Sequence, residues 1–476
     1  MTGVPDGGGG AAERLRADAL ASRERILDAA AAALSAGRRI SMTEIAAAAG
    51  VGRATLYRHF PSRDALRRAV ERGGLAAATP SPAVVPLGYQ RPGQLGHEGP
   101  LALEVTHVLD EVPPHLVPDQ LVAEARRAGG VPVALYVVDI DGSQLIRIAG
   151  SDDFPAELDA PPALGPEIVP EGLHRFEAEL GGRLPGCMVE PLLLRGRVLG
   201  LLLCIGTPQH SLHEIAKQGA AALELANDCT DSIEAARRRK PTTPAAEIQQ
   251  NLLPPRIARI SGAELAGGLL PTYEVGGDWF DFVENRDGAW LAIAEASGSG
   301  PTGAGLGAAA LGALRAARRS GHDLEQAVQA VQQTVHALGN GAFQIAALVG
   351  RWHAATSSFS WVNCGHQHAY VADTDGVLTE LGGLIYPTLG TGDPDARYQV
   401  SRRQLQSRER LILVTDGITE RRTEGGWFGV EGIARAITST ETTTAAATAM
   451  AILEAVTDCW REPLEDDATT VVLRVT

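Results

Sequence analysis

Four short acidic segments between residues 270 and 470 constrain this chain most, and three of them stand at the ends of predicted strands beside glycine or threonine. They are Val275-Gly-Gly-Asp278-Trp-Phe-Asp281, Glu295-Ala-Ser-Gly298, Thr415-Asp-Gly417 and Glu465-Asp-Asp-Ala-Thr469. A single acidic loop is usually only a solvent-exposed turn. Carboxylates at the ends of several strands, however, can lie close together in the folded chain. Oxygen ligands suit Mg²⁺ or Mn²⁺. Two such ions about 3.5–4 Å apart can clamp a phosphoryl group for in-line displacement.

Residues 244–476 alternate strand-like and helix-like patterns. Strands are predicted at 289–294, 343–352, 358–363, 368–373, 411–415 and 469–475, and helices at 303–319, 323–338 and 443–459.

The order of the acidic segments resembles the metal-dependent protein phosphatases (the PPM family), in the branch typified by SpoIIE. The resemblance covers about residues 244–475 and includes Gln250–Pro254, Asn363-Cys-Gly-His366, Pro387–Gly390 and Trp427-Phe-Gly429. It implies an αββα sandwich over residues 254–476, two Mn²⁺ or Mg²⁺ ions, and hydrolysis of phosphoserine or phosphothreonine on a protein such as an anti-sigma-factor antagonist. It also implies catalytic residues Asp278, Glu295, Asp416 and Asp466, and metal ligands Asp278, Glu295, Ala296, Asp416 and Asp466.

The second acidic segment departs from the family, which has Asp-Val-x-Gly-His-Gly there. Glu295 is one methylene longer than aspartate, and Ser299 replaces the histidine. A shift on the order of 1 Å at a reacting centre can cost about 100-fold in rate. His366 and His368 are expected to be turn or core residues. The alternative to an enzyme is therefore a transcriptional regulator with a catalytically impaired phosphatase domain.

A basic N-terminal segment, residues 13–74, carries a helix-turn-helix pattern. Its glycine, Gly50, suits the tight turn between two helices. The pattern over residues 22–70, Ile45-Ala-x-x-Ala-Gly-Val-x-x-x-Thr-Leu-Tyr-x-His-Phe60, resembles the TetR family of transcriptional regulators. The resemblance implies duplex-DNA binding as a homodimer. The DNA-contacting residues are expected to be Arg53, Thr55, Tyr57, His59 and Arg63. The alternative is a module for protein docking or dimerisation.

A proline- and glycine-rich linker, residues 75–100, precedes a mixed segment over 101–210. Val133–Val138 and Leu145–Ile148 predict one hairpin, and Pro191–Leu194 and Val198–Ile205 predict another. The segment resembles a GAF domain, an α/β sensor whose ligand the sequence does not specify. Cys187 and Cys204 are expected to be small core residues.

Residues 211–253 are predicted to form a signalling helix. Between Leu212 and Ala236, eight small or apolar residues recur with steps of three and four, which is a heptad pattern. Such a seam either packs on its own domain or joins two copies of the chain.

The amino-acid composition excludes several classes of protein. Of 476 residues, 42 are Lys or Arg and 57 are Asp or Glu, a net charge of −15, which excludes a chain that coats nucleic acid along its length. The apolar run Val198–Ile205 is far below the roughly 20 residues of a membrane span, so no membrane association is expected. Five unpaired cysteines and the lack of a signal peptide favour a cytoplasmic location. The sequence thus predicts a multidomain α+β bacterial signalling protein: a helix-turn-helix head, an α/β GAF-like sensor and an αββα phosphatase domain.

Overall fold

The computed structural model describes most of the chain from residue 111 onward and short pieces before it. The described residues are 25–27, 29, 30, 32, 42–51, 55, 56, 109, 111–140, 142–239, 242–272, 276–438 and 444–476. The chain divides into two compact units, residues 1–94 and 95–476, which we describe separately.

The first unit has the turn geometry that the helix-turn-helix pattern predicts. Helix α2 (Met42–Ala48) ends before Gly50, which has a φ of +64°. The Val51 N–H then donates to the Ala46 carbonyl. A small core is buried here and consists of Ile26, Ala30, Ile45, Ala46, Ala49 and Leu56. Of the predicted DNA-contacting residues only Thr55 is described; Arg53, Tyr57, His59, Arg63 and the linker 75–100 lie outside the described residues.

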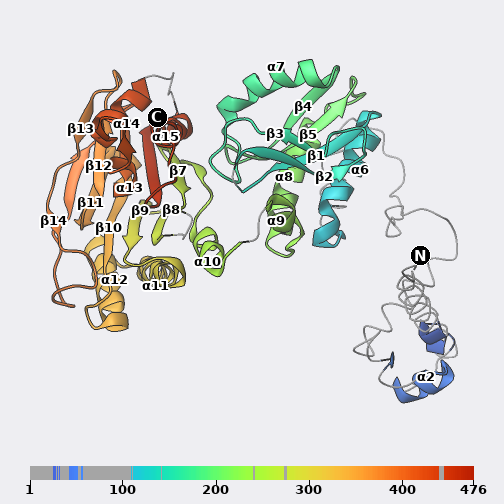
Figure 1. The fold of residues 1–476 in the computed structure, drawn as a ribbon, viewed down its shortest axis with the longest axis horizontal. Coiled ribbons are helices and arrows are strands. Elements are labelled where there is room, and N and C mark those ends of the chain that lie inside the picture. Colours follow the sequence, from blue (N-terminus) through green and yellow to red (C-terminus); the bar gives the residue numbers. More distant parts are fainter. Residues whose placement is uncertain are drawn as a thin grey trace, which may run out of the picture. The chain divides into compact units, whose positions relative to one another are not determined.

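The second unit begins with a five-stranded antiparallel sheet in the order β3-β2-β1-β5-β4 (Figure 1). Its strands are β1 (Val133–Val138), β2 (Gln144–Gly150), β3 (Glu157–Asp159), β4 (Cys187–Leu194) and β5 (Arg197–Ile205). Helices α6 (Val117–Gly129) and α8 (His213–Asn227) pack on one face, and α7 (Leu173–Arg183) packs on the other. Short 3-10 helices cover Pro114–Leu116 and Pro170–Gly172.

Both predicted hairpins of this sheet are confirmed. Strands β4 and β5 are joined by Arg195 and Gly196, which both have positive φ. Two consecutive residues of positive φ are the geometry of a type I′ turn, whose twist matches the flanking strands. Cys204 is buried in the core as expected, whereas Cys187 is only partly buried.

The single long helix predicted over residues 211–253 is wrong. The chain instead forms α8, α9 (Ser232–Arg237) and α10 (Pro244–Leu252). The polar residues 228–231 end α8, and Asp231 stands at the start of α9. The seam residues Ile215, Ala226 and Ile233 are buried against their own sheet. The heptad pattern therefore reflects packing within the domain.

Two six-stranded sheets face each other in the C-terminal part (Figure 1). One has the order β14-β11-β10-β9-β8, with β15 also pairing with β11, and the other has the order β13-β12-β16-β19-β7-β6. The strands of the first are β8 (Asp278–Asn285), β9 (Gly288–Ala296), β10 (Ile345–His353), β11 (Ser358–Cys364), β14 (Ile385–Tyr386) and β15 (Ser401–Gln404). Those of the second are β6 (Ile257–Ile260), β7 (Ala263–Leu270), β12 (His368–Ala372), β13 (Leu378–Glu380), β16 (Arg410–Val414) and β19 (Ala468–Val475).

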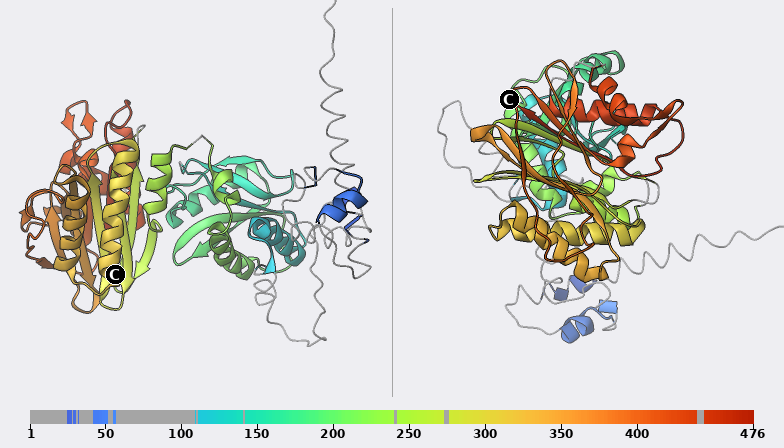
Figure 2. Two further views of the ribbon diagram at one scale, coloured as in Figure 1. Left: turned by 90° about the horizontal axis from the view of Figure 1, so that it is seen from below. Right: turned by 90° about the vertical axis from the view of Figure 1, so that its left-hand side faces the viewer.

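Helices cover the outer faces of both sheets, as further views show (Figure 2). Helices α11 (Gly300–Arg319) and α12 (Leu324–Gly339) pack on the first sheet, and α14 (Gly429–Thr438) and α15 (Ala445–Asp458) pack on the second. Residues between the sheets form a third apolar layer that includes Phe280, Phe359 and Leu413. The predicted αββα layering is therefore present. The remaining elements are α13 (Asp416–Thr419), β17 (Arg422–Thr423), β18 (Gly426–Trp427) and a 3-10 turn over Ala354–Thr356.

No helix among the described residues is both long enough and apolar enough to span a membrane.

Candidate metal centre

The two sheets of the sandwich bring their acidic segments together at one edge. Asp278 begins β8 and is the direct cross-strand partner of Glu295 on β9. Asp416 follows β16 and opens the short helix α13, while Asp466 stands just before β19. Each sheet therefore supplies two of the four predicted carboxylates, and the convergence expected from the strand ends is present.

The closest group in this cluster is formed by Glu295, His366 and Asp416. One ligand atom from each lies within 4.8 Å of the other two. His366 Nδ1 lies 3.3 Å from Asp416 Oδ2, and His366 Nε2 lies 3.8 Å from Glu295 Oε2. His366 stands in the turn between β11 and β12, as expected, but its side chain is 46 % exposed and faces two carboxylates.

Two oxygens of this group are buried without a hydrogen-bond donor: Glu295 Oε2 and Asp416 Oδ1. Burial, followed by the negative charges of Asp416 and Asp466, raises the pKa of Glu295 to about 8. Leaving buried acceptors unpaired is unfavourable. A cation between these side chains would satisfy both oxygens and relieve the repulsion that raises this pKa.

Asp278 is held differently from the other three acids. It is only 2 % exposed, and its Oδ2 accepts hydrogen bonds from the Thr415 hydroxyl (2.9 Å) and the Thr469 hydroxyl (2.6 Å). Burial, and then the charges of Asp467 and Glu295, raise its pKa well above the ordinary range. Asp278 thus lies across from Glu295 on the neighbouring strand and is held by threonines from the third and fourth acidic segments.

Asp466 lines a pocket of about 180 Å³ together with Asp416. The pocket is completed by Gly417, Glu420, Arg421, Arg422, Trp427 and Glu465. Burial and the charge of Asp416 raise the pKa of Asp466. The pocket gives the acidic centre an opening lined by four carboxylates and two arginines.

Asp467, which the sequence interpretation did not single out, is the buried acid of the fourth segment. It is 1 % exposed. Its Oδ1 accepts from the backbone N–H groups of Thr272 (2.8 Å) and Gly276 (3.0 Å), and its Oδ2 accepts from Gln249 Nε2 (2.8 Å). Gln249 also donates to the Asp278 carbonyl at 3.0 Å, so α10 is bonded directly to the base of the centre. The pair of adjacent aspartates was the only sequence signal for this role.

Asp281, the second acid of the first segment, has a structural role. Its carboxylate pairs with Arg315 and Arg318 of α11, each at 2.8 Å. It therefore ties β8 to the covering helix and lies outside the acidic centre.

The donors present fit a hard divalent cation. Carboxylate oxygens come from Glu295, Asp416 and Asp466, and Ala296 ends the same strand as Glu295. His366 adds a nitrogen donor, which borderline cations such as Mn²⁺ accept more readily than Mg²⁺.

Comparison with known families agrees with this geometry. Residues 285–476 match the family model described as "Stage II sporulation protein E (SpoIIE)". These residues are a SpoIIE-type domain. Residues 26–70 match the model of "Bacterial regulatory proteins, tetR family". Glu295, His366, Asp416 and Asp466 all lie inside the matched range, and Asp278 lies seven residues before it.

Individual relatives match between 48 % and 65 % of the chain. "Phosphoserine phosphatase RsbU" of Bacillus subtilis (strain 168) is 23 % identical over 233 residues, which is 48 % of this chain and 68 % of RsbU. The SiaA-PP2C domain of Pseudomonas aeruginosa is 19 % identical, with a TM-score of 0.42, over 54 % of this chain and 100 % of that domain. The phosphatase and partial regulatory domain of Bacillus subtilis SpoIIE is 14 % identical, with a TM-score of 0.40, over 65 % and 77 %.

Proposed function

We propose that the SpoIIE-type domain is a metal-dependent phosphatase acting on phosphoserine or phosphothreonine in a protein. The observation that carries this proposal is the pair of buried, donor-free oxygens on Glu295 and Asp416, two side chains whose ligand atoms lie within 4.8 Å of each other at the edge of the sandwich. The match to the family model and the homology to the phosphoserine phosphatase RsbU support the same reaction.

Two divalent ions, Mn²⁺ or Mg²⁺, would be held by Asp278, Glu295, Ala296, Asp416 and Asp466, with His366 beside them. Such ions, when bound, supply a hydroxide nucleophile and neutralise charge on the phosphoryl group. Thr415 and Thr469 fix Asp278 by hydrogen bonds to its carboxylate. Arg422 lines the pocket beside the acids and would offer a phosphoester a positive charge. The guanidinium of Arg421 is instead bonded to the backbone carbonyls of Trp460 and Pro463.

Hydrolysis of an aryl phosphate in the presence of Mn²⁺ tests this proposal. The natural chain should turn over the substrate, and Asp416→Asn should abolish turnover because it removes a ligand charge. Asp323→Asn is the matched control, since Asp323 is exposed at the N-terminus of α12, where asparagine caps equally well. Equal rates in the natural chain and Asp416→Asn would refute the assignment.

The alternative function is a regulator whose phosphatase domain has lost catalytic activity. Variants of Glu295 distinguish this alternative from an active phosphatase. Glu295→Asp should raise the rate or the Mn²⁺ affinity if the extra methylene is the only defect. Absence of calorimetric Mn²⁺ binding at millimolar concentration, together with no turnover in Glu295→Asp, would favour the regulator.

We further propose that the middle domain is a GAF-like sensor that controls the phosphatase. Its support is the direct bonding between the two: Glu167 of the middle domain accepts the backbone N–H groups of Arg256 and Ile257, each at 3.0 Å. An anti-sigma-factor antagonist is the proposed substrate, by analogy with the SpoIIE branch.

The tetR-family match supports a second activity, binding of duplex DNA by residues 13–74. The contacts proposed are Arg53, Thr55, Tyr57, His59 and Arg63, with two copies of the chain on one palindrome. Arg63→Ala should weaken binding to every sequence and flatten its salt dependence, because it removes a phosphate contact. Equal affinity for duplex DNA with and without residues 1–74 would refute this activity, and a monomeric mass by light scattering would refute the dimer.

A further inference from the structure

A cavity of about 250 Å³ lies where the middle domain contacts the strand that leads into the phosphatase sandwich. Val137, Leu199 and Leu223 line it from the sheet and α8 of the middle domain. Leu253, Pro254 and Pro255 line it from the segment that follows α10. Small-molecule sites occur preferentially at domain interfaces of this kind. The volume equals that of roughly eight water molecules in the liquid, which suits a small metabolite.

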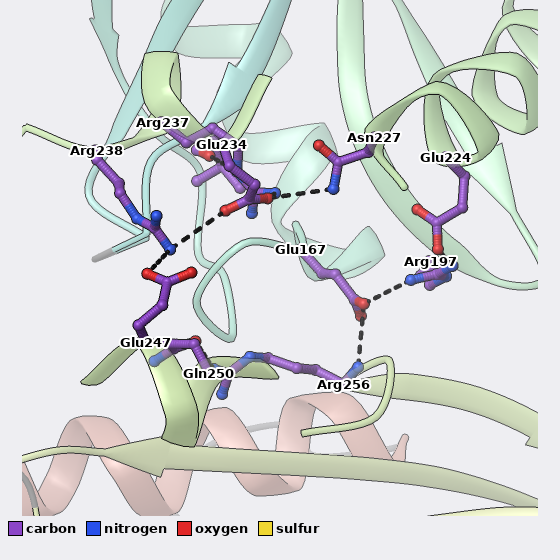
Figure 3. Close-up of polar contacts among 11 residues, drawn as sticks. Glu167, Arg197, Glu224, Asn227, Glu234, Arg237, Arg238, Glu247, Gln250 and Arg256 are labelled. Atoms are coloured by element: carbon purple, nitrogen blue, oxygen red, sulfur yellow. Dashed lines mark hydrogen bonds and ion pairs between the residues drawn. The ribbon is translucent and has the colours of Figure 1, made fainter. Parts of the chain in front are cut away.

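Charged side chains concentrate in this cavity, and its carboxylates already have partners (Figure 3). Glu167 pairs with Arg197 at 2.9 Å and accepts the two backbone N–H groups described above. Glu224 also pairs with Arg197. Glu234, adjacent to the cavity, pairs with Arg237 at 2.7 Å.

Arg256 is the cation of this cavity that lacks an acidic partner. The residue is 4 % exposed, and no carboxylate among the described residues lies within ion-pair distance of its guanidinium. Its side chain makes one hydrogen bond, from Nη2 to Gln250 Oε1 at 3.3 Å. Burial lowers its pKa to about 10; the charge of Glu167 opposes this shift, and the charge of Arg237 adds to it. A buried, unpaired guanidinium is costly, and an anion placed against it recovers that cost.

Further unused hydrogen-bonding capacity belongs to groups that line the same cavity. Arg237 donates through Nε to the Val138 carbonyl and through Nη1 to Glu234, but its Nη2 is buried without an acceptor. Asn227 Oδ1 is likewise buried without a donor. Two guanidinium groups with free N–H donors match the oxygens of a carboxylate or phosphate, while Asn227 can accept from a hydroxyl.

We propose that this cavity binds a small oxyanion, a carboxylate or phosphate, between the guanidinium groups of Arg237 and Arg256. Such a ligand would join α9 to the segment 250–256. That segment directly follows Gln249, the residue that bonds to Asp467 and the Asp278 carbonyl. A ligand bound here would therefore be connected to the metal centre through one helix, α10. An effect on the metal centre rests on the proposed phosphatase function, whereas anion binding does not.

Calorimetric titration of the full chain tests the proposal, with inorganic phosphate in one arm and succinate in the other. The protein is first freed of divalent metal on a chelating resin, so that phosphate cannot bind at the acidic centre. At least one arm should show saturable binding at one site per chain. The arm that binds tells which oxyanion the cavity prefers. Absence of binding by both anions at millimolar concentration would overturn the proposal.

Variants of two nearby arginines locate the site. Arg256→Met, which keeps the length of the side chain and removes its charge, should weaken binding by roughly tenfold or more. Arg256→Lys should weaken it less, because the charge stays while the planar fork is lost. Arg259→Met is the matched control on exposed β6 surface and should bind as the natural chain does. Unchanged affinity in Arg256→Met would overturn the proposal.

Hydrogen exchange of the natural chain decides the case if Arg256→Met does not fold. Added anion should slow exchange at 233–237 and 250–257. Slowed exchange confined to other segments would contradict the site. Turnover of an aryl phosphate is measured separately. Absence of turnover would refute the phosphatase function, whereas absence of anion binding would refute the cavity site.

Discussion

At Glu295, protonation of one side chain is linked to metal binding. The SpoIIE resemblance predicts aspartate at this position, and the additional methylene was expected to weaken a bridging site. In the structure the longer side chain reaches both His366 and Asp416, and one of its oxygens lacks a donor. The same side chain therefore holds a proton more tightly than ordinary glutamate, and metal must compete with that proton.

Metal affinity should consequently rise with pH through the pKa of Glu295, about 8. Below that pH the carboxyl of the metal-free protein is protonated, so apparent Mn²⁺ affinity should fall by up to about tenfold per pH unit. Calorimetry one unit below and one unit above this pKa measures the change. Glu295→Gln should bind Mn²⁺ weakly and with a flatter pH dependence. An equal slope in both proteins would assign the proton to another group.

His366 gives a second prediction at this scale. It lies between two acids, where a neutral imidazole nitrogen can ligate a cation. His366→Ala should weaken Mn²⁺ binding by about 10-fold or more and Mg²⁺ binding by less, since nitrogen ligands favour transition metals. His368→Ala is the control, because His368 stacks on Tyr370 and is separate from the acidic group. Equal losses in the two variants would exclude a ligand role.

At the scale of elements, the turn after β16 depends on one close approach of two backbones. A Cβ on Gly417 would lie 2.0 Å from the Asp467 carbonyl oxygen. Gly417→Ala should therefore push Asp416 away from Glu295, destabilise the fold by about 1–3 kcal/mol and reduce turnover by on the order of 100-fold.

Denaturant unfolding and aryl phosphate hydrolysis check both effects of Gly417→Ala. Gly425→Ala is the matched control, because no atom lies within 4 Å of the Cβ it would add. Normal stability and turnover in Gly417→Ala would show that the two backbones can separate without cost.

Regular strands were predictable because apolar and β-branched residues dominate them, as in Ile345–His353 and Ala468–Val475. Strand β7 escaped prediction because it contains Gly267 and Gly268, which weaken a strand pattern. The structure needs glycine there, since a Cβ on Gly267 would lie 2.3 Å from the Phe280 ring. The carboxylates of the centre were predictable from their strand ends. The roles of His366 and Asp467 depend on contacts between distant segments, which spacing does not encode.

At the scale of the second unit, Glu167 links the folding of its two domains. Its carboxylate is buried, pairs with Arg197, and accepts two backbone N–H groups at the start of the phosphatase sandwich. These bonds replace the strand partners that the edge of a sheet otherwise lacks. A buried carboxylate that is bonded to both domains should make them unfold together, because unfolding of either domain would leave an unpaired charged or polar group in the other.

Glu167→Gln should therefore separate two thermal transitions where the natural chain shows one for residues 111–476. The neutral amide cannot neutralise Arg197 and can accept fewer hydrogen bonds, at a cost of about 3 kcal/mol. Scanning calorimetry measures the number and midpoint of the transitions. Glu177→Gln, on the exposed side of α7, is the control and should leave the trace unchanged. A single transition at the natural midpoint in Glu167→Gln would mean that apolar contacts at the junction suffice. Two transitions in the natural chain would mean that the domains already unfold independently, and that a signal between them must pass through α10.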